Sequence, residues 1–262
     1  MDFGIRDRVA LVSAGSKGLG RAIAETLAAE GARVVVCARG AAALDATCRG
    51  IVEAGGRCHG IAADVSVPGD VAKVVAEAES TFGSVDILVT NSGGPKSGRF
   101  ETLTPEDWDA AARLLLSSAV GFARAVVPGM RARKWGRIIN VTSIAAKQPV
   151  DGLMLSNSLR AGVVAFARTL STEVARDGIT VNNLLPGYTR TQRVLDLSGQ
   201  MAAAGGTTPE DIVKRWEAEI PMQRLGEPRE LAALAAFLAS EQAAYMTGQS
   251  IAVDGGWIRG LF

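Results

Sequence analysis

Short apolar stretches alternate with Ala- and Leu-rich stretches along almost the whole chain, and this alternation constrains the fold more than any other feature. The apolar stretches predict strands at RVALVS, RVVVCA, CHGIAA, DILVT, GRIINVT, ITVNNLL and QSIAVD. Helices are predicted to begin near Gly18, Ala41, Gly69, Pro105, Leu153 and Pro228. Near-continuous apolar strands separated by amphipathic helices are typical of a parallel sheet covered on both faces. The sequence therefore predicts an α/β fold with a doubly wound, seven-stranded parallel sheet.

The chain is long enough to bury one large core. It has 262 residues, of which 48% are hydrophobic, and α/β sheets of this size commonly form one domain. We therefore expect a single domain over residues 1–262. The least regular stretch, at about residues 188–221, interrupts the alternation before the last helix. A loop-rich insertion at the carboxyl edge of such a sheet is usually a lid over the substrate, and the alternative is a tolerated surface insertion.

Charge and composition exclude several classes of function. The 28 basic and 27 acidic residues are spread along the chain, so the sequence has no basic patch for nucleic acid or an anionic membrane. No uninterrupted apolar run reaches the roughly 18–20 residues of a spanning helix, and residues 1–8 have no secretory apolar region. We expect a cytoplasmic protein that acts on small molecules. Cys37, Cys48 and Cys58 fit neither a disulfide framework nor, with His59, a zinc site, so we expect reduced packing residues and no metal.

The stretch SAGSKGLG, residues 13–20, directly follows the first strand and opens the first helix. Glycines in this context let the backbone approach a pyrophosphate, and the amides at the helix start donate to it. At the end of the second strand, where a carboxylate would bind the ribose of NAD, stands Arg39, and Lys17 lies in the glycine-rich turn. Two cations that can meet a 2′-phosphate favour NADP over NAD. The alternative for Arg39 is a solvated loop cation.

Four further stretches accompany these features: Asp64-Val65, Asn91-Ser92-Gly93, residues 186–191 and MTGQSIAVDGGW. With them the chain resembles the short-chain dehydrogenase/reductase family, of the 3-oxoacyl-[acyl-carrier-protein] reductase-like type, over essentially its whole length. The resemblance implies a Rossmann-type fold, a homotetramer or homodimer with Tyr245 at a subunit interface, and a small carbonyl or alcohol substrate. The cofactor-binding residues that it implies are Ser13, Gly15, Ser16, Lys17, Gly18, Leu19, Gly20, Arg39, Asp64, Val65, Asn91, Gly93, Arg160, Pro186, Gly187, Thr189 and Thr191. Ala14 stands where the family has its first glycine.

The catalytic positions depart from the family pattern. In the family a Ser is followed some thirteen residues later by Tyr and four residues further on by Lys, and an Asn comes from the preceding long helix. Ser143 matches the Ser, whereas the positions of Tyr, Lys and Asn hold Ser156, Arg160 and Leu115. Ser156 and Arg160 are still four residues apart, so the sequence predicts that they share a helix face.

These replacements remove the usual source of a proton. An aliphatic hydroxyl is a far weaker acid than a phenol, and an arginine does not release its proton in proteins. Loss of a positioned general acid typically costs about 10²- to 10⁴-fold in rate. We therefore hypothesise that Tyr188, or a water held by Ser143 and Ser156, donates the proton while Arg160 stabilises the oxyanion. The alternative for Tyr188 is packing against the lid.

Three classes of function remain open from the sequence. The leading one is an NADP(H)-dependent oxidoreductase acting on a ketone or secondary alcohol with a non-standard proton donor. The second is a nucleotide-binding sensor or partner subunit with little redox activity, because three relay positions have changed. The third is a dehalogenase-like lyase, because haloalcohol dehalogenases resemble this fold and use Ser and Arg, although they give up the nucleotide pocket that this sequence retains. The expected pocket residues do not identify a substrate; they are Ala145, Lys147, Gln148, Pro149 and Met201.

Overall fold

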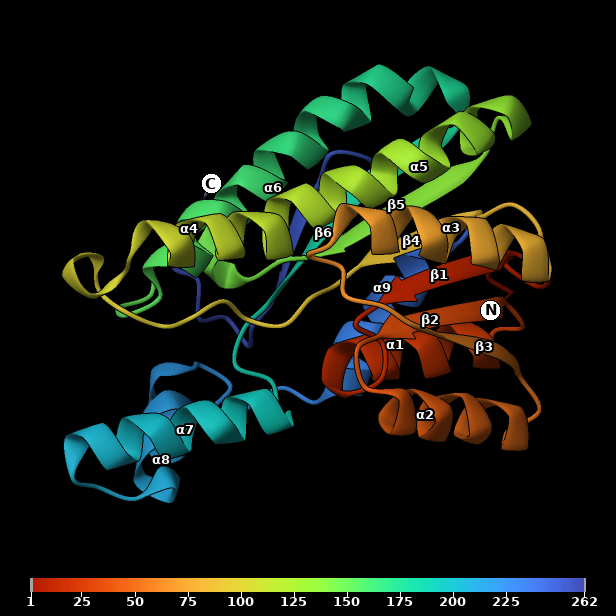
Figure 1. Cartoon of the computed structure of the whole chain (residues 1–262). Helices are drawn as coiled ribbons and strands as arrows, with labels where there is room; N and C mark the ends of the chain where they lie inside the picture. The colour runs from red at the N-terminus through yellow and green to blue at the C-terminus, as the bar shows by residue number, and fades with distance from the viewer. Residues whose placement is uncertain (1, 262) are drawn as a thin grey trace.

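A single seven-stranded parallel sheet runs through the molecule (Figure 1). The computed structural model describes residues 2–261, so the two ends of the predicted domain, Met1 and Phe262, lie outside the described residues. The strands are β1 (Val9–Ser13), β2 (Arg33–Ala38), β3 (Arg57–Ala62), β4 (Ile87–Thr90), β5 (Gly136–Val141), β6 (Ile179–Pro186) and β7 (Ser250–Val253). Their spatial order is β3-β2-β1-β4-β5-β6-β7, so the direction of winding reverses between β1 and β4. The predicted doubly wound Rossmann-type fold is confirmed.

Helices cover both faces of the sheet (Figure 1). One face carries α1 (Gly18–Ala29), α2 (Ala41–Glu53) and α9 (Pro228–Ala239), and the other carries α3 (Pro68–Phe82), α4 (Pro105–Ala112), α5 (Ser118–Arg133) and α6 (Met154–Val174). A π-helical turn, η2 (Arg113–Ser117), joins α4 to α5, and short 3₁₀ turns are η1 (Phe100–Thr102), η3 (Ile144–Ala146) and η4 (Ala175–Asp177). The predicted strand bounds and helix starts agree with the structure to within one residue.

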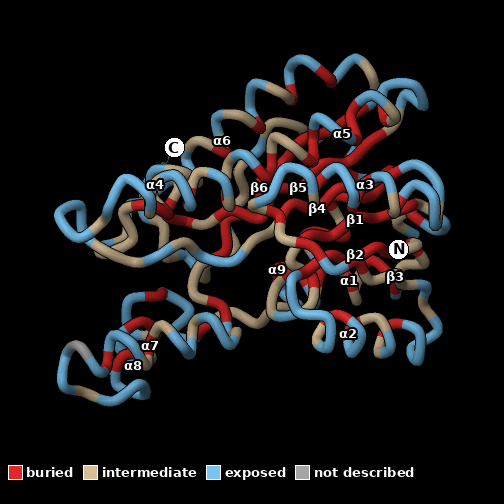
Figure 2. Tube along the Cα trace, viewed as in Figure 1, coloured by how far each residue is buried: buried red, intermediate tan, exposed pale blue. Residues whose placement is uncertain are grey.

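Two hydrophobic cores explain why the strands are apolar on both faces. In β1, Ala10 and Val12 belong to the core under α1 and α9, whereas Val9 and Leu11 belong to the core under α3 and α5. Successive side chains of a strand point to opposite faces, so both faces must be apolar when both are covered. Burying each Val or Leu stabilises the fold by roughly 1.5–3 kcal/mol. The sheet is accordingly the most buried part of the molecule (Figure 2).

The helix formed by α4, η2 and α5 spans Pro105–Arg133 and is long and apolar enough to cross a membrane by length and composition. Sequence analysis found no such run, because Arg113 and Arg124 interrupt the apolar residues. Its apolar side belongs to the second core, where Phe122, Val126 and Met130 are fully or almost fully buried. A core helix of a sheet meets the same criteria, and the packing of this one accounts for its composition.

The insertion at residues 188–221 is not loop-rich, and the prediction of an irregular segment was wrong. It forms two helices, α7 (Gln192–Gly205) and α8 (Pro209–Glu219), which stand apart from the main body beside the carboxyl edge of the sheet (Figure 1). Gly206 ends α7 with φ +61°, and Thr208 caps α8 by accepting from the Asp211 amide at 3.2 Å. The glycines that suggested a loop therefore form the short turn of a helical hairpin.

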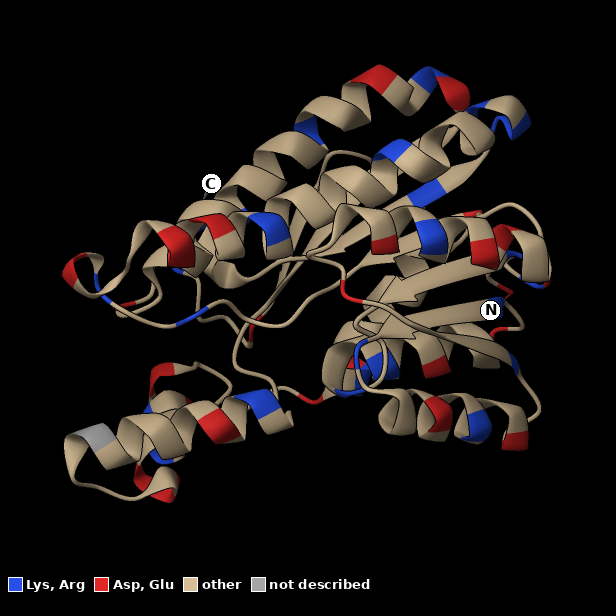
Figure 3. Cartoon of the chain, viewed as in Figure 1, with Lys and Arg blue, Asp and Glu red and all other residues tan. Residues whose placement is uncertain are grey.

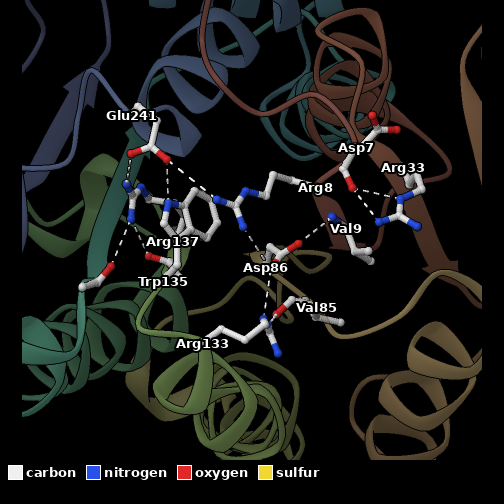
Figure 4. Close-up of polar contacts among 12 residues, drawn as sticks. Asp7, Arg8, Val9, Arg33, Val85, Asp86, Arg133, Trp135, Arg137 and Glu241 are labelled. Carbon is white, nitrogen blue, oxygen red and sulfur yellow. Dashed lines mark hydrogen bonds and ion pairs between the residues drawn. The ribbon is translucent and has the colours of Figure 1, made fainter.

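A polar cluster lies at the amino ends of β1, β4 and β5 (Figure 4). Arg137 is only 2% exposed, and its guanidinium donates to three backbone carbonyls and lies 3.4 Å from Glu241. The ring of Trp135 contacts both Arg8 and Arg137, with guanidinium carbons 3.9 and 4.3 Å from the ring centroid. Elsewhere basic and acidic residues are interspersed along the helices and loops of the chain (Figure 3). Arg137 is thus a buried charge whose guanidinium is satisfied by backbone carbonyls and by Glu241.

Candidate functional site

The glycine-rich turn is joined to the end of β4 by a pair of hydrogen bonds. Ser13 is 1% exposed, and its Oγ donates to the Asn91 carbonyl at 2.7 Å and accepts from the Asn91 amide at 2.8 Å. The Asn91 Nδ2 in turn donates to the carbonyl of Ala14 at 3.3 Å. The Ser13 hydroxyl is thus used inside the protein, and it holds Asn91 and the turn together where β1 and β4 meet.

The conformation of the turn depends on residues without bulk. A Cβ on Gly15 would lie 2.5 Å from Val36 Cγ1, and a Cβ on Gly20 would lie 2.4 Å from the carbonyl oxygen of Ala14. Ala14 itself has φ +46°, a left-handed conformation that costs an L-residue about 1–2 kcal/mol. The alanine therefore occupies a position with the backbone conformation that glycine prefers, and the turn forms in spite of it.

Three segments meet around the start of α1, where unpaired amides and the helix dipole favour an anion. Gly18 opens the helix with φ +54°, and a Cβ on it would come within 3.4 Å of Thr191 Cγ2. A Cβ added to Gly93, in the segment after β4, would have no other atom within 4 Å. The carbonyl of Ser16 accepts a hydrogen bond from Thr47 in α2 at 3.1 Å. The side chain of Leu19 packs against the first core. The predicted residues of the turn thus lie at one open edge.

Two cationic side chains, one in the turn and one after β2, lie along this edge. Arg39 follows β2 with its side chain 81% exposed, and its Nη1 lies 4.0 Å from Asp64 Oδ2. Lys17 is also exposed. The amide and hydroxyl of Ser66 hold the pKa of Asp64 below its ordinary value, with a smaller contribution from Arg39. Val65, in contrast, has its side chain packed in the second core, so that only its backbone faces the edge.

In the segment after β6, some residues pack within the fold and one lies beside the glycine-rich turn. Pro186 ends the strand, and the Gly187 amide donates to the carbonyl of Val253 at 3.0 Å. A Cβ on Gly187 would lie 2.8 Å from the Cβ of Asp254, so the position requires glycine. Thr189 is 5% exposed and donates to the carbonyl of Gly187 at 3.3 Å. Of the two predicted threonines, Thr191 is therefore the one placed beside the glycine-rich turn.

Arg160 points beneath the end of β5. Its Nε donates to Ser156 Oγ at 3.2 Å, as their spacing predicted, and its Nη1 donates to the carbonyls of Val141 at 3.2 Å and Thr142 at 2.6 Å. Desolvation, with a smaller contribution from the charge of Arg193, lowers the pKa of Arg160 to about 10, which keeps it charged at neutral pH. Much of the hydrogen-bonding capacity of this guanidinium is therefore used to hold the strand end and Ser156.

A small cavity separates Arg160 from the long helix. It measures about 10 Å³, which is about the room that one water needs. Its lining residues are Thr90, Asn91, Ser92, Leu115, Ser118, Ala119, Val141, Thr142, Arg160 and Val163. Leu115 lies in the π-helical turn and is 5% exposed. Leu115 thus gives this cavity an apolar wall beside Arg160.

Ser143 and Tyr188 lie in different environments. Ser143 is half-buried and caps η3, since its Oγ accepts from the Ala145 amide at 3.1 Å. Tyr188 stacks on Trp216 at 4.4 Å between ring centroids and packs on Trp257 at 5.1 Å, within the small core formed by α7, α8 and the segments beside them. Burial, with the charge of Glu219, raises the pKa of Tyr188 to about 12. A proton donor needs a pKa shifted the other way, so the structure favours packing over proton donation for Tyr188.

Sequence reasoning missed Arg193, which lies in the first turn of α7. Its guanidinium would lie 2.9 Å from a Cβ on Gly94, and its Nη2 donates to the carbonyl of Pro95 at 3.4 Å. The contact spans 98 residues of sequence, and no local pattern marks it. The π-helical turn around Leu115 was missed for a similar reason, because α4 and α5 read as one helix. Among residues 2–261, no group of three or more His, Cys, Asp or Glu side chains is arranged to hold a metal.

The fold and this edge define a nucleotide-binding enzyme fold of the dehydrogenase/reductase kind. Residues 13–258 match the family model described as enoyl-(acyl carrier protein) reductase. The chain belongs to the short-chain dehydrogenase/reductase family. It is 35% identical to the 3-oxoacyl-[acyl-carrier-protein] reductase FabG of Vibrio cholerae, over 96% of this chain and 98% of that protein.

Solved structures of reductases share the fold of this chain. The crystal structure of L-sorbose reductase from Gluconobacter frateurii, complexed with NADPH and L-sorbose, is 37% identical with a TM-score of 0.95 over 100% of both chains. A variant of actinorhodin polyketide ketoreductase with NADPH is 34% identical, with a TM-score of 0.93 over 97% of this chain and 98% of that one. The chain therefore shares its whole fold with reductases.

Proposed function

We propose that this chain is an NADP(H)-dependent oxidoreductase that interconverts a ketone and a secondary alcohol. The observation that carries the proposal is the complete nucleotide-binding edge, where the glycine-rich turn, Asn91 and Thr191 meet at the start of α1. Gly15 and Gly20 keep the shape of this turn, since neither position has room for a Cβ inside the fold. The retained turn argues against a dehalogenase-like lyase, a class of enzyme that gives up the nucleotide pocket.

The residues present fit NADP(H). The amides at the start of α1 suit a pyrophosphate, and Arg39 and Lys17 supply positive charge for a 2′-phosphate at the end of β2. Gly93 follows Asn91 at the end of β4 and has open space around it, and Thr191, in the segment after β6, lies beside Gly18 of the turn. When bound, NADPH supplies a hydride. L-sorbose reductase and actinorhodin ketoreductase, which share this fold, are both NADPH complexes.

The proton comes from water held at Ser143 and Ser156 in this proposal. Ser143 is half-buried beside η3, and Ser156 is oriented by its hydrogen bond from Arg160. Arg160 keeps its positive charge at this site and favours a developing oxyanion. It acts on the reaction mainly by positioning Ser156 and the end of β5, because its Nη1 is already bound to two carbonyls.

The substrate in this proposal is a small carbonyl or alcohol compound, and the protein is a cytoplasmic homotetramer or homodimer. Tyr245 is fully exposed, and Met222 and Leu261 also expose large apolar side chains. Light scattering on the full chain measures the assembly, and a monomer at all concentrations would exclude this part of the proposal.

Turnover tests the function. The full chain is mixed with NADPH and a panel of ketoses, cyclic and aliphatic ketones and 3-oxoacyl thioesters, and the absorbance at 340 nm is followed. We expect at least one substrate to be reduced, and Ser143→Ala to lower kcat about 10- to 100-fold with NADPH affinity unchanged. Ser158→Ala, on an exposed position of α6, is the matched control. Equal kcat for wild type and Ser143→Ala would remove the role given to Ser143.

A nucleotide-binding protein without redox activity is the second candidate. It is favoured by the Arg160 side chain tied to backbone carbonyls and by the apolar wall that Leu115 forms. Tight NADPH binding without consumption of NADPH by any member of the panel would select this candidate over the first.

A further inference from the structure

Cys48 and Cys58, which come from different elements, place their sulfurs side by side. Cys48 lies in the middle of α2 and Cys58 lies in the edge strand β3, and their Sγ atoms are 2.6 Å apart. A disulfide bond is about 2.05 Å long, so the two sulfurs need to approach by only about half an ångström. The spacing of the three cysteines did not indicate a disulfide framework, and the proximity arises only when α2 folds onto β3.

The local packing explains how the two thiols meet. A Cβ on Gly60 would lie 2.9 Å from Leu44 Cγ and 3.2 Å from Cys48 Sγ. Cys58 and Gly60 are two residues apart in β3 and therefore face the same side, which α2 covers. Glycine at position 60 thus lets α2 come close enough for its cysteine to reach Cys58. Both cysteines are half-buried, whereas Cys37 is fully buried in β2.

We propose that Cys48 and Cys58 are a modification site at which a hydroperoxide forms an intramolecular disulfide that ties α2 to β3. The hydrogen bond between the thiols lowers the pKa of Cys48 and raises that of Cys58, so Cys48 is the nucleophile. Burial raises the pKa of Cys37 to about 12, which leaves that thiol unreactive.

The reaction balances with hydrogen peroxide as the oxidant. The Cys48 thiolate attacks one peroxide oxygen, the sulfur–oxygen bond forms, the oxygen–oxygen bond breaks, and the hydroxide that leaves takes up the proton released by the Cys48 thiol. The Cys58 sulfur then attacks the sulfenic acid, the sulfur–sulfur bond forms, and the sulfur–oxygen bond breaks. The Cys58 proton leaves with the oxygen as a second water. Two thiols are oxidised to one disulfide, and one peroxide is reduced to two waters.

The cross-link lies next to the nucleotide-binding edge. Thr47, one residue before Cys48, is fully buried and donates to the carbonyl of Ser16 in the glycine-rich turn at 3.1 Å. A disulfide at Cys48 therefore restrains the helix that supports this turn. Because it also closes a loop in the unfolded chain, it should raise the melting temperature by about 5 °C.

Peptide mapping tests the proposal directly. The full chain is treated with hydrogen peroxide, alkylated under denaturing conditions and digested with trypsin without reduction. Cleavage after Arg39, Arg49, Arg57 and Lys73 places Cys48 in peptide 40–49 and Cys58 in peptide 58–73. We expect these two peptides to be joined by a disulfide, and a dithiol reductant to separate them.

Three variants sharpen the test. Cys48→Ser and Cys58→Ser should each abolish the linked pair and the peroxide-induced rise in melting temperature. Cys37→Ala, which removes the buried third cysteine, should leave both unchanged. Absence of the linked pair in the wild type, or alkylation of all three cysteines after peroxide treatment, would overturn the proposal. A linked pair without a rise in melting temperature would overturn its stabilising effect.

Discussion

At the scale of single residues, Arg160 fixes the end of β5. A lysine could pass a proton along a relay, whereas this guanidinium donates to Val141, Thr142 and Ser156 and keeps its charge. We predict that Arg160 and Leu115 stand at the family's Lys and Asn positions. In that arrangement a fixed support for the strand end replaces a mobile donor, and an apolar side chain lines the cavity.

Ala14 provides a stability prediction. Its φ of +46° is unfavourable for alanine and free of cost for glycine, although glycine also loses more entropy on folding. We expect Ala14→Gly to raise the free energy of unfolding by about 0.5–1 kcal/mol in urea denaturation. The matched Gly15→Ala variant should lower it, since a Cβ there would lie 2.5 Å from Val36. A destabilised Ala14→Gly protein would contradict the strain assigned to this position.

Tyr188 provides a prediction in pH. Because burial raises its folded-state pKa to about 12 from an ordinary value near 10, the unfolded chain releases this proton first. The stabilisation by the neutral phenol is fully present below pH 10 and is lost as the pH rises towards 12. The part of the 295 nm absorbance change that Tyr188→Phe removes should have a midpoint near pH 12. A midpoint near 10 would place the ring in water.

Turnover of the same variant tests whether Tyr188 donates a proton. Loss of a general acid costs about 10²- to 10⁴-fold, whereas loss of the hydroxyl from a ring packed between tryptophans removes no reacting group. We therefore expect Tyr188→Phe to retain its kcat on a verified substrate. A fall in that range would return Tyr188 to the catalytic set.

At the scale of elements, α7 and α8 form a helical hairpin with a core of its own, the segment that the sequence predicts as a lid. Ala202, Ile212, Trp216, Ile220 and Leu225 are buried there, apart from the two cores of the sheet. A Trp→Ala change in a core typically costs about 3–5 kcal/mol, and Trp216 is the largest of the five buried side chains here. We expect Trp216→Ala to unfold α7 and α8 locally and leave the sheet intact.

Limited proteolysis measures this effect. New cleavage sites should appear within residues 192–219, while the far-UV spectrum keeps most of its helical signal and the melting temperature of the sheet changes little. Trp135→Leu, in the polar cluster at the amino ends of the strands, is the control and should give no new cleavage in the lid. Cooperative unfolding of the whole chain by Trp216→Ala would show that the lid is not an independent unit.

At the scale of the whole molecule, local patterns were sufficient for the sheet but not for contacts between distant segments. The seven strands and their helices followed from apolar runs such as RVVVCA, because both faces of each strand are covered. The helices of the lid were missed because Gly205 and Gly206 suggested a loop, although they form one short turn. The proximity of Cys48 and Cys58, and of Arg193 and Gly94, depends on how elements pack, and no residue pattern along the chain encodes it locally.

Part of the candidate site could likewise be predicted from local sequence, and part could not. The glycine-rich turn was predictable, because its residues must be small wherever a strand passes into a helix beside a pyrophosphate. The environment of Tyr188 was not predictable, because its stacking partners Trp216 and Trp257 come from later parts of the chain. Position in a motif therefore did not determine where this side chain lies.

Calorimetric titration of the full chain with NADPH and with NADH tests the central claim, that the nucleotide-binding edge is intact and takes NADP(H). Charge-assisted hydrogen bonds from Arg39 or Lys17 to a 2′-phosphate should contribute about 1.5–3 kcal/mol, which corresponds to NADPH binding at least about 10-fold more tightly than NADH. Failure to bind either nucleotide, or equal affinity for both, would contradict the account.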